Sequence, residues 1–320
     1  MSRKPKAASA APGDFTGLVA RMRSGDRRAI SRVLTELERA SAILPELVAA
    51  LRPHLGHALV VGFTGPPGAG KSTLANAYTA HLRQSGKTVG IIAVDPSSPI
   101  SGGAILGDRI RMTTTLDDDG VFMRSLASRG HLGGLCPAAV RIIDGLDAAG
   151  KDIVLIETVG TGQSEIDVAE VADVRVVVMA PGLGDDIQAM KAGLLEIADV
   201  MVVNKADRDG AERTMHQLLG AAQLRDQTRA KTTVLKTTAS TGAGVGPLAE
   251  AIANIGAARL ALDGSERRRR RARYLIARAA ADLIAERIRA GGERGLDQLA
   301  DAVLTGRLLP ADAAKKLVNG

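Results

Sequence analysis

The 320-residue chain has very few aromatic side chains: three Phe, two Tyr and no Trp, or 2% of its residues. Proteins that bind single-stranded nucleic acids without sequence preference stack the bases on aromatic rings, so this scarcity argues against that class. Any core must be built from Ala, Val, Leu and Ile. The supply is sufficient, because hydrophobic residues make up 45% of the chain.

Cysteine is also scarce. The single thiol, Cys136, can form neither an internal disulfide nor a cysteine metal cage. The five histidines are scattered without ligand spacing, so we expect no structural metal site. No apolar run reaches the roughly 18 residues that a membrane-spanning helix needs. The basic start of the chain lacks the apolar segment of a secretory signal. We therefore expect a disordered leader of about 13 residues and a cytoplasmic protein.

The net charge of +7 is concentrated at the two ends of the chain. Residues 1–55 carry ten basic against five acidic side chains, and residues 264–320 carry thirteen against seven, which leaves the middle acidic. An acidic body weakens a nucleic-acid-binding interpretation and separates three regions. We predict an N-terminal helical extension over residues 1–55, a central domain over 56–255 and a C-terminal helical arm over 256–320.

The two ends have helical periodicity. In the extension, Asp26 is predicted to cap one amphipathic helix and Ser41 a second. The predicted inward faces are Ile30, Val33, Leu34 and Leu37 in the first helix, and Leu44, Leu47, Val48 and Leu51 in the second. In the C-terminal region, the run Arg267–Arg271 is either a partner site or a solvated helix face, and we favour the solvated face.

The central domain alternates short apolar, β-branched runs with helix-sized segments. This pattern predicts an α/β fold with a mostly parallel sheet covered by helices on both faces. Ligands of such sheets lie beyond the carboxyl ends of the strands. The predicted strands are residues 58–63, 88–94, 120–125, 152–157, 174–180, 199–204 and 232–236.

The stretch "GPPGAGKST" follows the first predicted strand and fits G-x-x-x-x-G-K-[ST]. Its glycines let successive backbone N–H groups point at phosphate oxygens, and the following helix offers its positive N-terminal end. Lys71 would neutralise phosphate charge, and the Ser72 hydroxyl would bind Mg²⁺. A plain glycine-rich turn is the alternative. The predicted phosphate contacts are Gly65, Pro66, Pro67, Gly68, Ala69, Gly70, Lys71, Ser72 and Thr73.

The tetrapeptide "NKAD" at the end of the sixth predicted strand favours GTP over ATP. The Asp207 carboxylate would accept hydrogen bonds from guanine N1–H and the 2-amino group, whereas adenine would leave it unpaired. The Lys205 stem would lie over the base, and Asn204 would reach N7. Thr238 and Ala239 occupy the loop whose backbone N–H would meet guanine O6, where guanine-binding proteins usually show Ser-Ala.

Acidic residues at strand ends predict a magnesium site. Glu157 ends the strand expected beside the phosphate loop, and Asp95 ends the second predicted strand. Carboxylates there can hold Mg²⁺ directly or through water. Asp108, in a glycine-rich loop, is either a metal contact or a helix N-cap. Gly160 would bring its N–H to the γ-phosphate. The predicted catalytic residues are Lys71, Asp95, Asp108 and Glu157; the predicted metal ligands are Ser72, Asp95, Asp108 and Glu157.

Five motifs occur in an order that resembles one family. They are "GPPGAGKST", "VDPSSPISGGAILGDRIRM", "ETVGTGQSE", "PGLGDDIQAMKAG" and "NKAD". In order and spacing they resemble the MeaB/ArgK family, the cobalamin-mutase chaperone branch of the metallochaperone GTPases. The resemblance covers nearly the whole chain, and the long block beginning at Val94 is its most specific part. It implies a P-loop NTPase fold of the SIMIBI type and a central GTPase domain.

The resemblance also implies a function and partners. Family members hydrolyse GTP to GDP and phosphate, and they protect and reactivate adenosylcobalamin-dependent acyl-CoA mutases, chiefly methylmalonyl-CoA mutase. Hydrolysis gates the entry of intact cofactor and the release of damaged cofactor. The C-terminal arm commonly makes a homodimer. Neither nucleic acid nor membrane is an expected partner. Methylmalonyl-, ethylmalonyl- and isobutyryl-CoA mutases stay open as the partner.

The family's functional residues map onto this sequence by motif. The resemblance places the phosphate and Mg²⁺ site at Lys71, Ser72, Asp95, Asp108 and Glu157, and the base site at Asn204, Lys205 and Asp207. It assigns residues 180–191 to a switch segment that communicates with the mutase. Two other functions compete with this one. A nickel or zinc metallochaperone GTPase is disfavoured because Cys-rich and His-rich tracts are absent, and a ribosome-associated GTPase rests only on Arg267–Arg271.

Overall fold

The computed structural model describes most of the chain. The described residues are 15–95, 118–127, 137–158, 164–182, 194–226, 232–261, 264–290 and 292–319. The chain forms two compact units, residues 1–268 and 269–320. The sequence-based division at residues 55 and 255 stays a prediction. Among the described residues, no helix is long and apolar enough to cross a membrane.

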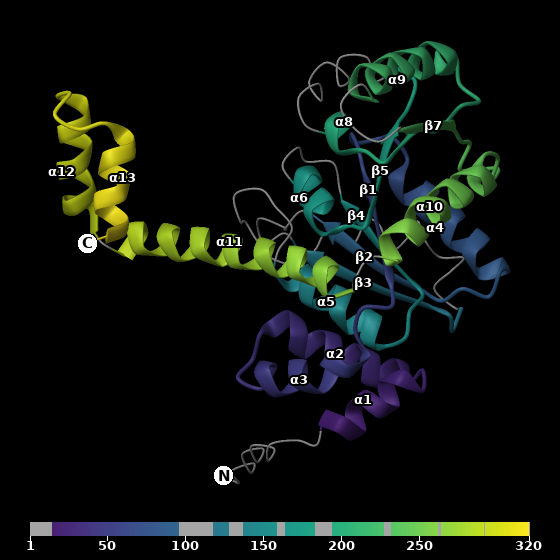
Figure 1. The fold of residues 1–320 in the computed structure, drawn as a ribbon, viewed down its shortest axis with the longest axis horizontal. Coiled ribbons are helices and arrows are strands. Elements are labelled where there is room, and N and C mark those ends of the chain that lie inside the picture. The colour runs from purple at the N-terminus through teal and green to yellow at the C-terminus, as the bar shows by residue number, and fades with distance from the viewer. Residues whose placement is uncertain are drawn as a thin grey trace, which may run out of the picture. The chain divides into compact units, whose positions relative to one another are not determined.

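A seven-stranded sheet forms the centre of the first unit (Figure 1). The strands are β1 (Leu59–Thr64), β2 (Val89–Asp95), β3 (Val121–Ala127), β4 (Ile153–Thr158), β5 (Val174–Met179), β6 (Val200–Val203) and β7 (Thr233–Lys236). Their order is β3-β2-β4-β1-β5-β6-β7, and every neighbouring pair is parallel. The predicted α/β fold is confirmed, with each strand within two residues of its predicted bounds.

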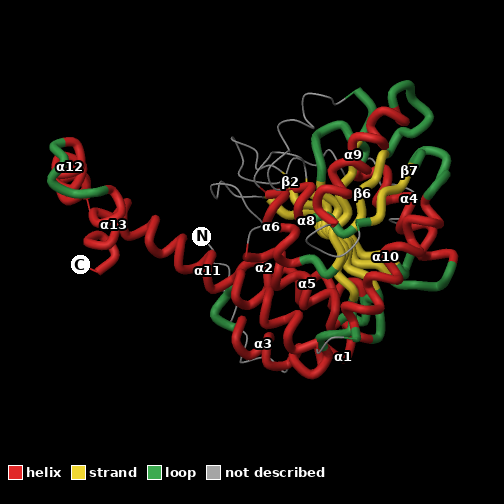
Figure 2. The backbone as a smooth tube through the Cα atoms, turned by 45° about the horizontal axis from the view of Figure 1, so that its top comes forward, coloured by secondary structure: helices red, strands yellow, loops and turns green. Residues whose placement is uncertain are grey.

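Helices cover both faces of the sheet (Figure 2). They are α4 (Lys71–Gln84), α5 (Pro137–Ala148), α6 (Ser164–Val171), α8 (Leu194–Ile197), α9 (Ala211–Asp226) and α10 (Val245–Leu260). Successive strand residues point to opposite faces. Val176 and Val178 therefore join a core cluster with α4 and α10, whereas Val177 and Met179 join a cluster with α8 and α9. Burial on both faces explains why the strands read as unbroken apolar runs.

Two of the few aromatic side chains meet in this core. Phe63 of β1 and Tyr78 of α4 pack edge to face, with ring centroids 5.8 Å apart and an interplanar angle of 89°. Edge-to-face pairs add stabilisation beyond the area that they bury. Burial raises the pKa of the Tyr78 hydroxyl, which therefore stays neutral. The contact fixes α4 to β1 on either side of the loop that joins them.

The N-terminal helices are α1 (Phe15–Arg23), α2 (Arg27–Arg39), α3 (Leu44–Leu51) and the 3-10 turn η1 (Arg52–His54). The Asp26 cap of α2 is confirmed, because its Oδ1 accepts hydrogen bonds from Arg28 N (2.9 Å) and Ala29 N (3.1 Å). The predicted inward face of α2 is buried. It packs on α5 at Gly145, where a Cβ would lie 2.6 Å from Leu34 Cδ2.

The Ser41 cap was a wrong prediction. Helix α3 begins at Leu44 without a side-chain cap, and Ser41 Oγ instead donates a hydrogen bond to Glu36 Oε2 (2.9 Å). Pro45 lies in the first turn, where its fixed φ and missing N–H suit a helix start. Val48, predicted to point inward, is 42% exposed.

The second unit is helical, as predicted. It contains the rest of α11 (Gly264–Ala290), α12 (Gly292–Leu304) and α13 (Pro310–Asn319). Several of its large apolar side chains are strongly exposed, among them Ile276 (69%), Leu283 (66%) and Leu304 (84%). Large apolar surface left in water is typical of an interaction surface.

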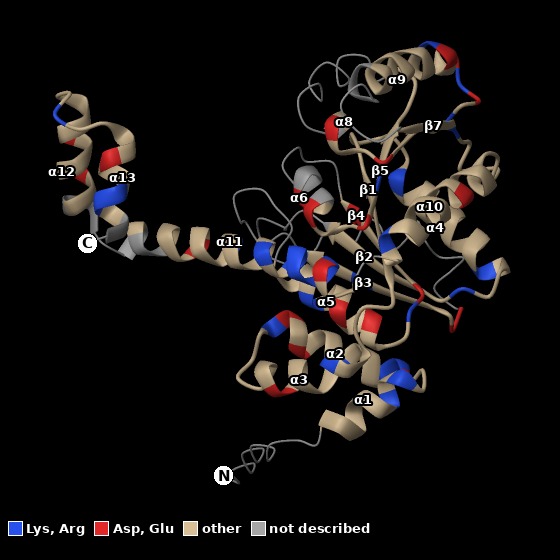
Figure 3. Cartoon of the chain, viewed as in Figure 1, with Lys and Arg blue, Asp and Glu red and all other residues tan. Residues whose placement is uncertain are grey.

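The prediction of a solvated face for Arg267–Arg271 was wrong for Arg267 and for Arg271, which is 3% exposed. Figure 3 shows basic residues gathered at the start of α11, but the Arg267 side chain is only 7% exposed. Its Nη1 pairs with Asp173 Oδ2 (3.1 Å), and its Nη2 donates to Gly56 O (2.6 Å). Asp173 Oδ2 also accepts a hydrogen bond from Val60 N (3.0 Å). This buried pair fixes the amino end of β1.

Candidate nucleotide-binding site

The loop between β1 and α4 requires glycine at two motif positions. Gly65 has φ 139°, and a Cβ there would lie 2.1 Å from Val178 O of β5. Gly70 has φ 86° at the N-cap of α4, and a Cβ there would lie 2.5 Å from Asn204 Nδ2. Only glycine adopts such conformations at low cost and leaves room for this close approach. The loop is therefore pressed against β5 and the end of β6.

Lys71 is the first residue of α4, and its side chain curls back over the loop. It is 6% exposed, and its Nζ donates hydrogen bonds to Gly65 O (2.7 Å) and Pro66 O (3.0 Å). A positive charge therefore lies beside the N-terminus of a helix, where the helix dipole also favours anions. Thr73, by contrast, is exposed.

Ser72 and Glu157 are in direct contact. Ser72 Oγ donates a hydrogen bond to Glu157 Oε1, and the two residues are 7% and 2% exposed. The contact follows from the strand order, because β4 lies beside β1 with Glu157 opposite Phe63. The sequence predicted that Glu157 would lie next to the phosphate loop, and the structure brings the two together.

The remaining acidic candidates are only partly described. β2 ends at Asp95, one residue beyond the pair Val94 and Thr158, so its backbone lies at the same edge of the sheet. Asp108 and Gly160 lie outside the described residues, and so do residues 183–191, the larger part of the predicted switch segment 180–191.

Asn204 links the phosphate loop to the loop after β7. Its Nδ2 donates to Ala69 O (2.9 Å) and Gly70 O (3.3 Å). Its Oδ1 accepts hydrogen bonds from Thr237 Oγ1 (3.1 Å) and Ala239 N (3.1 Å). Because Asn204 is 1% exposed, breaking this network would leave buried polar groups unpaired. Sequence reasoning missed Thr237, although the run "KTTAS" offered it.

The rest of the NKAD motif lies along the same edge. Lys205 has φ 57°, and its Nζ donates to Gly68 O (2.7 Å), so its stem runs beside the phosphate loop. Asp207 is exposed. Thr238 N donates to Ala243 O (2.9 Å), which closes a tight turn after β7. The ends of β1, β4, β6 and β7 thus bring together residues from four separate motifs.

The Asn204 network predicts a modest effect for Thr237→Val. Valine keeps the shape of threonine but removes the hydroxyl that donates to Asn204 Oδ1. Losing one such hydrogen bond costs about 1 kcal/mol, so we expect GTP affinity to fall roughly fivefold. Isothermal titration calorimetry measures the change.

Thr233→Val at the start of β7, the strand that precedes Thr237, is the matched control, because its hydroxyl makes no hydrogen bond among the described residues. Equal GTP affinities for the two variants would contradict a role for the Asn204 network.

A glycine-rich loop between a strand and a helix, at the carboxyl edge of a parallel sheet, defines a P-loop nucleoside triphosphatase fold. Comparison with known proteins gives the family. Residues 27–293 match the family described as methylmalonyl-CoA mutase-associated GTPase MeaB. The chain therefore belongs to the MeaB family of P-loop GTPases, which confirms the resemblance noted from the motifs.

Curated relatives agree with this assignment. A putative GTPase of Pyrococcus horikoshii is 48% identical over 239 residues, which is 73% of this chain and 75% of the relative. GTPase ArgK of Escherichia coli is 43% identical over 60% of this chain and 59% of its own length. The mouse protein named methylmalonic aciduria type A homolog, mitochondrial, is 37% identical over 61% of this chain and 49% of its own length.

A solved structure supports the fold over nearly the full chain. The crystal structure of a protein titled LAO/AO transport system kinase superimposes with a TM-score of 0.77. The two chains are 26% identical, and the match covers 98% of this chain and 99% of the other.

Proposed function

We propose that this GTPase binds Mg²⁺·GTP at the carboxyl edge of its sheet and uses hydrolysis to control an adenosylcobalamin-dependent acyl-CoA mutase. The observation that carries the nucleotide site is the buried cluster of Lys71, Ser72 and Glu157, joined through Asn204 to the loop after β7. This cluster places a cation, a hydroxyl and a carboxylate around one loop.

The residues at this edge suit a magnesium ion. Mg²⁺ prefers oxygen ligands and in nucleotide sites takes one or two from the protein. Ser72 Oγ and Glu157 Oε1 are two such oxygens, already in contact and buried. When bound, the ion neutralises charge on the phosphates. Asp95 and Asp108 are the further proposed ligands, directly or through water.

Binding the phosphates requires Lys71 to change partners. Its Nζ is held by Gly65 O and Pro66 O, and phosphate oxygens would compete for the same ammonium group with a stronger, charge-assisted hydrogen bond. The backbone N–H groups of residues 65–73 and the N-terminus of α4 stabilise the remaining negative charge. Gly160 is proposed to contact the γ-phosphate.

Guanine selectivity is assigned to the NKAD motif and the turn after β7. The exposed Asp207 carboxylate accepts from N1–H and the 2-amino group, and the Lys205 stem covers one side of the base. Asn204 Nδ2 donates both its hydrogens within the protein, so it has to exchange the longer bond, to Gly70 O (3.3 Å), in order to donate to N7. Ala239 N, next to Thr238 in the chain, is proposed to donate to guanine O6. It donates to Asn204 Oδ1 at 3.1 Å, so it has to share or exchange that bond when guanine binds.

The partner is proposed to be methylmalonyl-CoA mutase. The family description supports this choice, as does the name of the mouse relative. Loss of the γ-phosphate relaxes the loop at Gly160 and the segment 180–191, which gates cofactor loading and release. The exposed Ile276, Leu283 and Leu304 support dimerisation through the C-terminal arm.

A pull-down from the native lysate tests the partner. The full chain is immobilised, loaded with a non-hydrolysable GTP analogue, and its eluate is identified by mass spectrometry. We expect a cobalamin-dependent acyl-CoA mutase, enriched over the eluate of the GDP-loaded chain. Recovery of a nickel or zinc enzyme, or of ribosomal RNA in a salt-dependent manner, would contradict the proposal.

A further inference from the structure

The first unit contains a pocket at the amino ends of the central strands, opposite the strand ends at which the phosphate loop lies. Its volume is about 650 Å³, within the range of small-molecule sites. Its lining includes Leu59 and Ile153, the paired first residues of β1 and β4. β1 runs from Leu59 to Thr64, so the phosphate loop begins roughly 17 Å away. The two sites therefore cannot share one ligand of nucleotide size.

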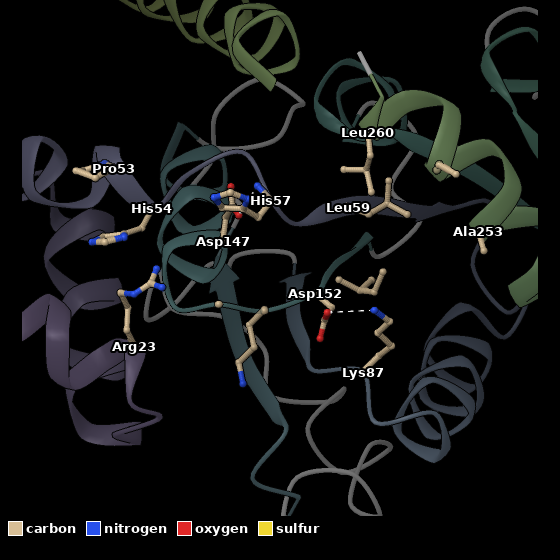
Figure 4. Close-up of a pocket in the computed structure, with 15 residues that line it drawn as sticks. Arg23, Pro53, His54, His57, Leu59, Lys87, Asp147, Asp152, Ala253 and Leu260 are labelled. Carbon is tan, nitrogen blue, oxygen red and sulfur yellow. Dashed lines mark hydrogen bonds and ion pairs between the residues drawn. The ribbon is translucent and has the colours of Figure 1, made fainter. Parts of the chain in front are cut away.

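The pocket has a basic side and an apolar side (Figure 4). Arg23 of α1 and His54 of η1 lie on one side, with His57 between them and the other wall. Leu59 and the α10 residues Ala253 and Leu260 form the apolar side.

The residues of α10 that line the apolar side are small, so few side-chain atoms project from this wall into the pocket. The face of α10 that lines the pocket carries Ala253, Gly256 and Ala257. A Cβ at Gly256 would lie 2.5 Å from Leu59 Cδ2, so the helix approaches β1 closely at this point. The result is a shallow apolar wall of the kind against which a flat ring can lie.

The two carboxylates of the pocket each accept several hydrogen bonds within the protein. Asp147 accepts hydrogen bonds from the backbone N–H groups of Gly56 (2.5 Å), His57 (3.0 Å) and Ala58 (2.8 Å). Asp152 accepts from Thr88 N and Thr88 Oγ1, both at 2.8 Å, and pairs with Lys87 Nζ at 3.3 Å. Asp152 is therefore paired with a lysine, and Asp147 is held by three backbone N–H groups.

Three nitrogen-bearing side chains that line the pocket have donor groups that a ligand could use. Among the described residues, the side chains of Arg23, His54 and His57 make no hydrogen bond or ion pair. Lys151 does not belong to this group, because its Nζ donates to Gly120 O at 3.2 Å. A guanidinium group offers the planar, two-pronged donor set that binds phosphate oxygens in a bidentate manner.

We propose that this pocket binds a small organic phosphate, with its phosphate group held by Arg23, His54 and His57 and its apolar or ring portion against α10. This site is separate from the nucleotide site and does not depend on the mutase as partner. Because the pocket contacts the amino ends of β1 and β4, its occupant touches the two strands that carry the phosphate loop and Glu157.

Calorimetry with 1-naphthyl phosphate tests the proposal. The full chain is first saturated with Mg²⁺ and GDP so that the phosphate loop is filled. We expect saturable binding at one site, and at least tenfold weaker binding of inorganic phosphate and of 1-naphthol, since each lacks one half of the recognition. Absence of binding up to about 1 mM, or equal binding of inorganic phosphate, would overturn the proposal.

Variants locate the site. Arg23→Gln and His57→Gln are each expected to weaken binding about tenfold, the effect of one charge-assisted hydrogen bond. Ala257→Glu places a carboxylate on the exposed part of the apolar wall and is expected to abolish binding. Arg28→Gln, an equal loss of charge on the exposed face of α2, is the matched control and should bind normally. Normal binding by all four variants would show that the phosphate binds elsewhere.

Discussion

Lys71→Ala is expected to lower the rate of GTP hydrolysis about a thousandfold while leaving the fold intact. Catalysis of phosphoryl transfer depends on fixed positive groups that stabilise charge developing on the phosphates. Lys71 Nζ lies buried within the phosphate loop, where it donates to two carbonyl groups, and exchanging these for phosphate oxygens brings its charge to that task. Alanine leaves the backbone of the loop and the N-terminus of α4 in place.

The measurement is single-turnover phosphate release from the purified chain with Mg²⁺·GTP. Circular dichroism and the thermal midpoint report the fold. Lys315→Ala, which removes an exposed ammonium from α13, is the matched control and should hydrolyse GTP at the normal rate. A normal rate of phosphate release in Lys71→Ala would remove the phosphate loop from the mechanism.

The sheet was predictable because a strand that is buried on both faces has an unbroken run of apolar residues, which can be recognised in the local sequence. Each strand is a short run of β-branched and other apolar residues, and the intervening helices have the length that parallel connections need. The phosphate loop was predictable for a different reason. Gly65 and Gly70 adopt positive φ and approach neighbouring atoms closely, so a side chain is excluded at both positions.

Contacts between segments that are distant in the sequence produce no local pattern, so they could not be predicted. The Arg267 run looked like a solvated helix face, because its partner Asp173 is 94 residues away and follows a different element. Asn204 was expected to serve the base, but its amide also ties together two loops that only the fold brings close. The pocket at the amino ends of the strands is lined by residues that range from α1 to α10, so no single stretch of sequence predicts it.

Asp207→Asn is expected to weaken GTP binding about a hundredfold and to strengthen the binding of xanthosine triphosphate. The carboxylate would accept from both guanine N1–H and the 2-amino group, whereas the amide sets a donor against the amino group. Two donors facing each other, the new side-chain amide and the guanine 2-amino group, together with the loss of one charge-assisted hydrogen bond, cost about 3 kcal/mol. Xanthine carries an oxygen in place of the amino group, so the same amide donates to it.

The geometry favours a clean result, because Asp207 is exposed and Asp207→Asn changes neither the size of the side chain nor the contacts that hold the loop. Those contacts are made by Asn204 and Lys205, which stay unchanged. Competition calorimetry with GTP and xanthosine triphosphate measures the exchange of preference. Asp209→Asn, an equal charge loss at an exposed position two residues along, should keep GTP selectivity. If both variants bind GTP as the native chain does, the base lies elsewhere and the NKAD motif serves only to join the loops.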